Sequence, residues 1–421
     1  MSAQNSNSPK LGGIRAWLIF SLAAISFGYA FIHRVAPGVM VDELMQEFAI
    51  GGAVVGILSA LYFYPYVLLQ IPLGALLDRL GPRIILGSAL LLATGGSIAF
   101  GFADTIFIAY IGRFLIGVGC AAGFLSALTL AGRWFPPNQF ALLSGLTMFV
   151  AMMSAVLGQA PLAVLVNDIG WRQSTLALGV FGSILAIIIF AFVRSSPAGA
   201  EVRKAESWGS MWHGLGRAMT SANVWKIAFV ASAMSGPMLT LGGLWGTPYL
   251  MNAYGLSKEY AAFLVSLIFF GWAFGAPSAG WLSDRLQRRK IILVAGSAVM
   301  TIVLMLLITL PTAPLWLTVS LLAITGASGG CMACSFALVR ETSPVEISGS
   351  VTGIVNSLTV ASGALLQPIV GWLLDLQWDG RLVDGSRIYQ PEDFRVAFLV
   401  VMAIGFLGFL ISLTLKDTPK P

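Results

Sequence analysis

Charged residues are scarce in this chain. Asp, Glu, Lys and Arg make up 10% of its 421 residues, whereas a soluble globular protein carries roughly 25%. So few charges cannot cover a water-facing surface, which excludes a soluble enzyme and a disordered protein. The net charge of +6 and the pI of 9.3 would suit a nucleic-acid binder, but the positions of the basic residues explain both without nucleic acid as a partner.

Cysteine and histidine are scarce as well. Three cysteines do not make a disulfide framework, and two histidines do not make a multi-histidine metal site. The sequence contains no Walker loop, nucleophile elbow or cluster of metal-ligand residues. We therefore expect no enzymatic activity, no cofactor and no bound metal. The sequence also gives no support for ATP-driven transport by this chain alone.

Long apolar runs are what the sequence does contain. Hydrophobic residues make up 57% of it, and the mean hydropathy is +0.86. A membrane-spanning helix needs about 20 mostly apolar residues. Because the runs are continuous rather than alternating, they predict helices and not strands. Twelve spans are predicted, at residues 16–37, 52–77, 84–103, 106–131, 140–166, 173–193, 225–250, 260–283, 290–310, 315–338, 349–374 and 395–415.

Positive charge is distributed unevenly between the two sides that these spans define. With a cytoplasmic N-terminus, seventeen Lys and Arg residues fall inside, six fall outside, and Arg113 lies within a span. The positive-inside rule therefore predicts that both termini are cytoplasmic. We predict a multi-pass, monomeric protein of the cell inner membrane.

One polar segment interrupts the apolar sequence. Residues 195–222 contain charges and serines, and we interpret them as a cytoplasmic linker. The linker separates two predicted domains, an N-terminal six-helix bundle at 1–194 and a C-terminal six-helix bundle at 223–421.

The two halves resemble each other. The pattern G-x-L-x-D-R-L-x-x-R occurs at 74–83 and again at 280–289. At a similar offset, Gly145 and Gln159 match the pair Gly353 and Gln367. Parallel repeats of this kind are a transporter architecture, with the binding site between the halves near the membrane midplane.

The sequence resembles the major facilitator superfamily over essentially its whole length. The resemblance rests on the repeated loop pattern, on the run RFLIGVGCAA that begins at Arg113, and on twelve spans with a central linker. It implies an all-α membrane protein whose twelve transmembrane helices form two pseudo-symmetric six-helix bundles, and transport by alternating access. It also implies that the repeated loop gates the inner side, through Gly74, Asp78, Arg79, Arg83, Asp284 and Arg285. Positive-inside topology alone would explain these arginines, but not the aspartate repeated at 284.

The stretch from Arg34 to Gly74 resembles the sugar-acid and organic-anion branch of that superfamily. In that branch an arginine at the end of the first span pairs with the substrate carboxylate, and a tyrosine before the Gln-Ile-Pro of the second span lines the same cavity. Here these residues are Arg34 and Tyr66. Arginine is suited to planar, bidentate capture of a carboxylate. The alternative is that Arg34 reaches to the outer headgroups.

Other residues inside the spans are candidates for contact with a substrate. Tyr62 and Tyr66 share a helix face because they are four residues apart, although an aromatic stripe is also compatible with plain packing. Arg113 is a charge within a span, which is functional by default; its alternative is a structural role against backbone carbonyls. The other candidates, of which the amides also suit interhelical bonds, are Gln159, Trp245, Tyr249, Asn356 and Gln367.

The sequence departs from the proton-coupled members of that branch. They carry a carboxylate just before the first-span arginine and another in the fourth span, and here these positions hold His33 and a residue near Cys120. No predicted span has Asp or Glu at mid-depth. His33 is therefore the candidate for proton coupling, because imidazole titrates in the useful range. A uniporter or an anion exchanger is the alternative.

We predict a secondary active or facilitative transporter of a small organic anion or zwitterion, with a carboxylate favoured and proton coupling left open. The first alternative is a proton-coupled drug or siderophore exporter of the same fold. The fifth span argues against it, since residues 157–161 read Leu-Gly-Gln-Ala-Pro and contain no Gly-Pro pair. The second alternative is a non-transporting receptor or scaffold, and the repeated gate pattern argues against that.

Overall fold

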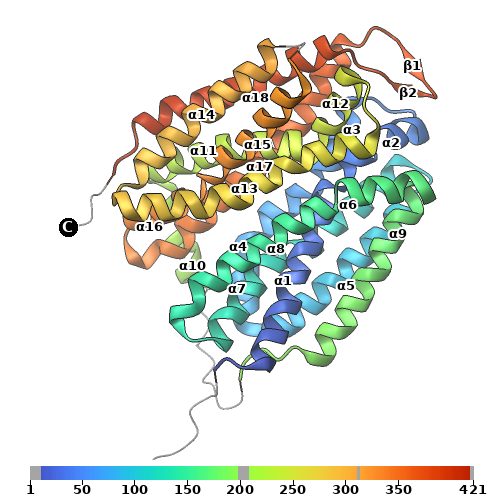
Figure 1. The fold of residues 1–421 in the computed structure, drawn as a ribbon. Helices are drawn as coiled ribbons and strands as arrows, with labels where there is room; N and C mark the ends of the chain where they lie inside the picture. Colours follow the sequence, from blue (N-terminus) through green and yellow to red (C-terminus); the bar gives the residue numbers. More distant parts are fainter. Residues whose placement is uncertain (1–10, 198–207, 311–312, 418–421) are drawn as a thin grey trace, which may run out of the picture.

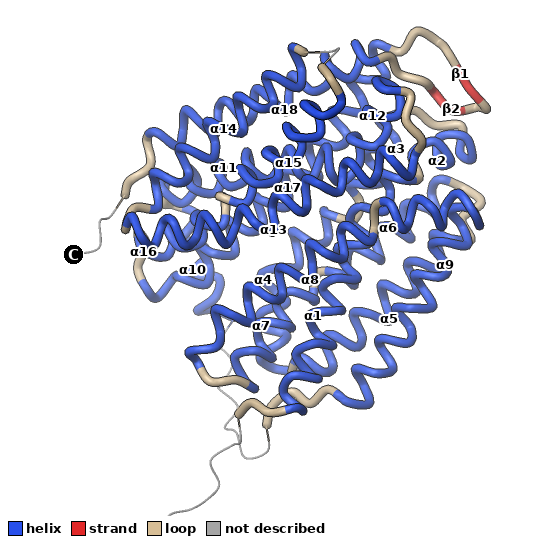
Figure 2. Tube along the Cα trace, in the orientation of Figure 1, coloured by secondary structure: helices blue, strands red, loops and turns tan. Residues whose placement is uncertain are grey.

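The fold is seen in a computed structural model, which describes residues 11–197, 208–310 and 313–417. Nearly all of this part of the chain is helical (Figure 2). The strands within it are β1, Leu382–Val383, and β2, Ser386–Arg387, which pair as a short antiparallel hairpin. The predicted all-α class is confirmed.

The helices of the first half occur in the following order: α1 Ile14–Val35, η1 Ala36–Val39, α2 Val41–Phe48, α3 Gly52–Ala60, α4 Phe63–Leu80, α5 Pro82–Gly101, α6 Ile106–Cys120, α7 Ala122–Trp134, η2 Pro137–Gln139, α8 Phe140–Leu157 and α9 Ala160–Phe192. Those of the second half are α10 Trp208–Met219, α11 Ala222–Pro237, η3 Met238–Trp245, α12 Gly246–Tyr254, α13 Lys258–Leu286, α14 Arg289–Thr309, α15 Leu315–Gly330, α16 Ala333–Glu341, η4 Val345–Ile347, α17 Ser348–Gln377 and α18 Pro391–Leu413.

Eleven stretches of the described residues are long and apolar enough to cross a membrane, and one of them contains two spans. That stretch is Pro137–Phe192, of 56 residues. As a continuous helix it would be about 84 Å long, far more than a bilayer core of about 30 Å. Gly170 breaks it with φ 82° and ψ 160°, a left-handed φ that glycine adopts without strain. The twelve predicted spans are therefore all present.

The helices form two bundles that lie against each other. Figure 1 shows the first half, coloured blue to green, as one bundle, and the second half, coloured yellow to red, as the other. The helices α1, α5, α6, α7, α8 and α9 pack among themselves, and so do α11, α13, α14, α15, α16 and α18. The chain thus has the two-bundle architecture that its internal repeat predicts.

Both ends of the described chain lie on one side of the bundles, which we call the terminus side. There the amide of Gly12 donates to the carbonyl of Trp134 (2.8 Å), and the indole of Trp134 donates to the carbonyl of Arg194 (3.0 Å). We call the opposite side the hairpin side, after β1 and β2. Lys258 lies there, in an ion pair with Glu43 of α2. Residues 198–207 of the predicted cytoplasmic linker lie outside the described residues.

The two halves approach each other most closely on the hairpin side. There α3 crosses α17, and Gly52 lies so near Gly371 that a Cβ on Gly52 would come within 2.9 Å of its carbonyl oxygen. Gly56 is likewise pressed against the backbone at Gln367. On the terminus side, α7 and α16 pack against helices of their own halves. The structure is therefore closed on the hairpin side and separated on the terminus side.

Candidate substrate-binding site

Arg34 lies in the last turn of α1 and is buried, with 5% of its surface exposed. Four aromatic rings surround its guanidinium group. The Cζ atom lies 4.2 Å from the ring centroid of Phe31, 5.1 Å from Tyr66, 5.6 Å from Tyr62 and 5.8 Å from Phe63. Three of these rings come from the break between α3 and α4 and from the first turn of α4. The structure thus brings together Arg34, Tyr62 and Tyr66, as the sequence predicts.

The guanidinium group of Arg34 is not fully paired. Its Nε and Nη2 atoms are buried and have no hydrogen-bond partner within the described part of the chain. No ion pair found there includes Arg34. Cation–π contact with the rings offsets part of the desolvation cost, but it leaves these N–H donors unused. A buried charge with free donors is the feature expected of an anion-binding group.

Arg113 of α6 is also buried but is satisfied by backbone. Its side chain donates to the carbonyl of His33 at 2.9 Å and to those of Leu58 and Ser59 at 3.4 Å each. Its Cζ atom lies 5.4 Å from the ring centroid of Tyr62, so Tyr62 contacts both arginines. In this conformation Arg113 fastens the end of α1 to α3. This is the structural role that was its alternative.

His33 points into the first bundle. Its Nε2 atom is 3.4 Å from the hydroxyl of Ser97 on α5, and the edge of its ring meets the ring of Tyr29 at 4.5 Å between centroids. Close by, the hydroxyls of Tyr29 and Thr94 are buried without a hydrogen-bond partner within the described residues. His33 therefore belongs to a polar cluster beside the Arg34 site rather than to the aromatic shell around Arg34.

Gln159 and Gln367, the pair matched by the sequence repeat, make matching bonds. Gln159 Nε2 donates to the carbonyl of Gly242 at 2.7 Å, and Gln367 Nε2 donates to the carbonyl of Leu239 at 2.8 Å. Both carbonyls belong to η3, an eight-residue π-helical stretch in the seventh span. Gln159 reaches across from the first half, whereas Gln367 lies in the second. The two amides thus hold η3 from both sides.

The other predicted contacts are placed differently. The indole of Trp245 donates to the carbonyl of Gln367 at 3.0 Å. The ring of Tyr249 packs on Phe394 and Phe398 of α18, within the second half. Asn356 Nδ2 donates to Gln70 Oε1 at 3.1 Å and so joins the halves. Of these three, only Asn356 bonds to the first half.

Gln70 is a polar residue that the sequence reasoning used only as part of a motif. It is buried at 7% exposure, and its Nε2 is 3.5 Å from the carbonyl of Ala121 while its Oε1 accepts from Asn356. Tyr66 and Gln70 are four residues apart on α4, so they share a face. The four-residue spacing from Tyr66 could have predicted that Gln70 extends the site toward the terminus side.

The gate residues lie on the terminus side, at the ends of helices. Asp78 is 3.7 Å from Arg133 in an exposed ion pair, and Arg83 donates to the carbonyl of Phe190. In the second half, Arg289 pairs with both Asp284 and Glu341. Each of these bonds stays within one half. These bonds therefore do not join the two halves on the terminus side.

A cross-half contact on the hairpin side is one that the sequence reasoning missed. The Asp375 carboxylate, near the end of α17, accepts from the amides of Gly52 and Ala53 at 2.8 and 2.9 Å. It also accepts from the Tyr389 hydroxyl at 2.6 Å and from Arg387 Nη1 at 3.0 Å. Asp375 thus caps the N-terminus of α3, where the helix dipole favours a negative charge. Burial, and next the hydrogen bond to Asp375, raise the pKa of Tyr389, which keeps its hydroxyl a donor.

Known proteins share this architecture and sequence pattern. The profile of the Major Facilitator Superfamily matches residues 16–368 and 247–421. The chain is 24% identical over 396 residues to a protein of Cupriavidus necator named as a probable sulfoacetate transporter, covering 83% of this chain and 91% of that protein. It is 23% identical over 414 residues to the probable galactarate/D-glucarate transporter of Bacillus subtilis, covering 89% of each.

Solved structures agree on the fold. A bacterial homologue of the human lysosomal transporter Spinster, in an inward-facing and occupied conformation, superposes with a TM-score of 0.78. The superposition covers 96% of this chain and 97% of that one, at 16% sequence identity. At this identity the likeness concerns the fold alone.

Proposed function

Because the chain belongs to the Major Facilitator Superfamily, and so is a multi-pass membrane transporter, we propose that it carries a small organic anion or zwitterion with a carboxylate by alternating access. The observation that carries this proposal is Arg34, a buried cation with two unused donor nitrogens and no acidic partner among the described residues. The substrate carboxylate supplies the missing counter-charge.

The chemistry of the pair supports a carboxylate. A charge removed from water costs several kcal/mol unless a partner satisfies it. A guanidinium group offers parallel N–H donors that match the two oxygens of a carboxylate. The rings of Phe31, Tyr62 and Tyr66 exclude water around the pair, and this strengthens the electrostatic attraction. Relatives named as transporters of sulfoacetate and of galactarate or D-glucarate support an organic acid as the substrate class.

The placement of the site supports alternating access. Arg34 lies where α1 meets the break between α3 and α4. The ring of Phe63, which contacts the Arg34 guanidinium group, lies against Gly363 of the second half. The halves are joined on the hairpin side and separated on the terminus side. We place the terminus side in the cytoplasm and the protein in the inner membrane, because Lys and Arg are concentrated on that side. The structure would then be a cytoplasm-open state.

The proposal includes proton coupling through His33. A second cation beside Arg34 and Arg113 is unfavourable without an anion, and a carboxylate bound at Arg34 offsets that repulsion. Protonation of His33 would thereby depend on the presence of substrate. Facilitated diffusion or anion exchange is the alternative.

The proposal is tested by ligand binding to the purified protein. A thermal-shift screen of carboxylates, with amines of matched size as controls, should identify carboxylates as the stabilising class. Arg34→Ala should weaken binding of the best carboxylate at least 30-fold, since losing one member of a buried charge pair costs about 2–5 kcal/mol. Arg172→Ala is the matched control, because Arg172 is a peripheral arginine paired with Glu47. Equal binding by Arg34→Ala and the parent would refute the proposal.

A further inference from the structure

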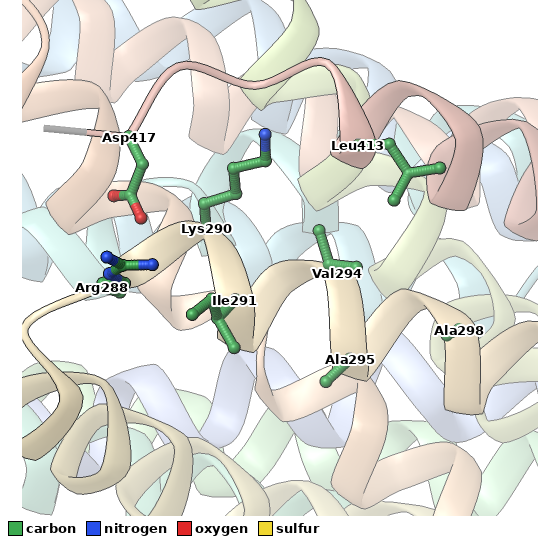
Figure 3. A pocket seen from close by; sticks show the side chains of 8 residues that line it. All are labelled: Arg288, Lys290, Ile291, Val294, Ala295, Ala298, Leu413 and Asp417. Atoms are coloured by element: carbon green, nitrogen blue, oxygen red, sulfur yellow. The ribbon is translucent and has the colours of Figure 1, made fainter.

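A groove lies between α14 and the C-terminal end of α18, away from the Arg34 site. It opens on the terminus side of the second half and has a volume of about 640 Å³. Figure 3 shows Arg288, Lys290 and Asp417 together at one end of it and Ala298 at the other. The groove shares no lining residue with the Arg34 site.

The end of the groove on the terminus side is charged. Arg288 and Lys290 are absent from the ion pairs found in the described part of the chain. The Asp417 carboxylate points toward Arg288 (Figure 3), and its Oδ1 atom is buried without a hydrogen-bond donor from the described residues. Two cations and one carboxylate leave a net positive charge, and the free oxygen still requires a donor.

The rest of the groove is apolar and shallow. It is lined by α14 residues Ile291, Val294, Ala295 and Ala298, and by Leu413 of α18. Ile291 and Leu413 are 42% and 47% exposed. The small side chains at 295 and 298 lower the helix surface over one turn. A charged end followed by an apolar channel along a membrane helix matches the shape and polarity of a lipid molecule.

The first half fills the equivalent position with its own chain. There α5 and α9 correspond to α14 and α18. The ring of Phe190 covers Gly87, where a Cβ would lie within 2.5 Å of it, and Arg83 donates to the Phe190 carbonyl. The repeated loop pattern aligns Arg83 with Arg289, which pairs with Asp284 and Glu341. It aligns Arg288 and Lys290 with the uncharged Pro82 and Ile84. The basic end of the groove is therefore particular to the second half, and the described residues leave the groove there open.

We propose that this groove binds an anionic phospholipid whose headgroup carries hydroxyl groups, of the phosphatidylglycerol class. The lipid phosphate pairs with Arg288 and Lys290, since basic groups between membrane helices attract anionic headgroups. A headgroup hydroxyl donates to Asp417 Oδ1, and an acyl chain lies over Ala295 and Ala298. This inference rests on the membrane-spanning fold and not on the identity of the transported substrate.

The test is native mass spectrometry of the purified full chain with an equimolar mixture of phosphatidylglycerol and phosphatidylcholine that have identical acyl chains. The parent should retain phosphatidylglycerol preferentially. Arg288→Ala/Lys290→Ala should lower that retention on the order of tenfold or more, because each basic residue contributes on the order of 1 kcal/mol to binding of acidic lipid. Lys226→Ala, which removes an exposed cation outside the groove, should retain the lipid as the parent does.

Two further arms distinguish a lipid site from a site for any small phosphate anion. Ala298→Phe keeps every charge but fills the channel, so it should lower phosphatidylglycerol retention although the basic end is intact. Soluble glycerol phosphate, which lacks acyl chains, should not displace the lipid. Equal retention of both lipids by the parent, unchanged retention in the double variant or in Ala298→Phe, or displacement by glycerol phosphate would each overturn the proposal.

Discussion

Arg34 and Arg113 are both buried arginines in the first bundle, and their surroundings differ in one respect. Arg113 donates to three backbone carbonyls, whereas two nitrogens of Arg34 have no partner among the described residues. An arginine that donates hydrogen bonds to buried backbone carbonyls stabilises the fold. A buried charge whose donors are partly unpaired costs stability instead.

Replacing the two arginines by methionine should therefore change stability in opposite directions. Arg113→Met removes three hydrogen bonds to backbone carbonyls in the bundle interior, so we expect a loss of about 3 kcal/mol and a lower Tm. Arg34→Met removes an unpaired charge, so we expect the Tm of the substrate-free protein to rise while the substrate-induced shift disappears. Thermal unfolding with and without the best carboxylate from the screen measures both effects. A fall in Tm for Arg34→Met as large as that for Arg113→Met would contradict this assignment of roles.

Single residues were predicted from sequence where their chemistry is unusual for a membrane span. An arginine and two tyrosines at helical spacing stand out in an apolar chain, and they do meet in space. The state of pairing was not predictable, because the partners of Arg113 are backbone carbonyls at 33, 58 and 59 that no side-chain pattern reveals. Asp375 was missed for the same reason, since its partners are the amides at the start of another helix.

At the scale of elements, the contact between α17 and the N-terminus of α3 holds the hairpin side closed. Asp375 receives four hydrogen bonds, and two of them come from the other half. An asparagine has one acceptor oxygen and no charge, so Asp375→Asn should cost about 2 kcal/mol of this contact. That loss shifts the balance toward a state open on the hairpin side by roughly 30-fold.

The shift in balance can be measured as a distance between the halves. Spin labels at positions 104 and 260, with the three native cysteines replaced by alanine, report the separation on the hairpin side by pulsed electron resonance. Asp375→Asn should increase the population with a long distance. Asp379→Asn is the control, because Asp379 pairs with the nearby Arg381 in the same loop. The same distance distribution in Asp375→Asn and the parent would show that this contact does not set the conformation.

The positions of the membrane spans were predictable from the sequence, whereas the π-helical stretch within the seventh span was not. Twelve apolar runs suffice to locate twelve helices, because only a helix satisfies its own backbone in lipid. In the π-helical stretch η3, two backbone carbonyls accept hydrogen bonds from the side-chain amides of Gln159 and Gln367. Both glutamines lie far from η3 in the sequence. A break that depends on tertiary bonds leaves no local periodicity to detect.

At the scale of the whole molecule, two bundles and two sides imply that each closed side has its own lock. In this structure the hairpin-side lock is formed and the terminus-side ion pairs stay within each half. Asp78 is about half exposed and lies 3.7 Å from Arg133, so this pair stabilises the present state by at most about 1 kcal/mol. Its contribution is expected in the opposite state, where the gate residues meet the other half.

Asp78→Asn should accordingly alter turnover more than affinity. We expect the rate of substrate flux into proteoliposomes to change severalfold while the dissociation constant measured on the purified protein stays within a factor of two. Asp104→Asn, an exposed acid on the hairpin side, serves as the control for loss of one negative charge. Flux and affinity that both match the parent would remove Asp78 from the gate.

Coupling to protons is a property of the whole cycle, because a proton must bind on one side and leave on the other together with the substrate. His33 is one candidate proton carrier, because it is a histidine within the bundles beside the proposed anion site. Asp42 is the other candidate, at the hairpin side just beyond the first span. Burial raises the pKa of its carboxyl group, and the nearby Lys258 lowers it. Because the pKa is raised in the folded protein, acidification on that side protonates Asp42 before ordinary surface carboxyls.

A pH gradient imposed on proteoliposomes separates these two groups. We expect the gradient to drive accumulation of the carboxylate by the parent, and we expect His33→Gln to abolish accumulation while leaving exchange without a gradient intact. His213→Gln, which removes the other histidine of the chain, should behave as the parent. Accumulation that survives in His33→Gln but is lost in Asp42→Asn would move the proton site to the hairpin-side entrance. Absence of accumulation in the parent would make the protein a uniporter or an exchanger, in which the charge of Arg34 alone selects the substrate and the substrate gradient alone sets the direction.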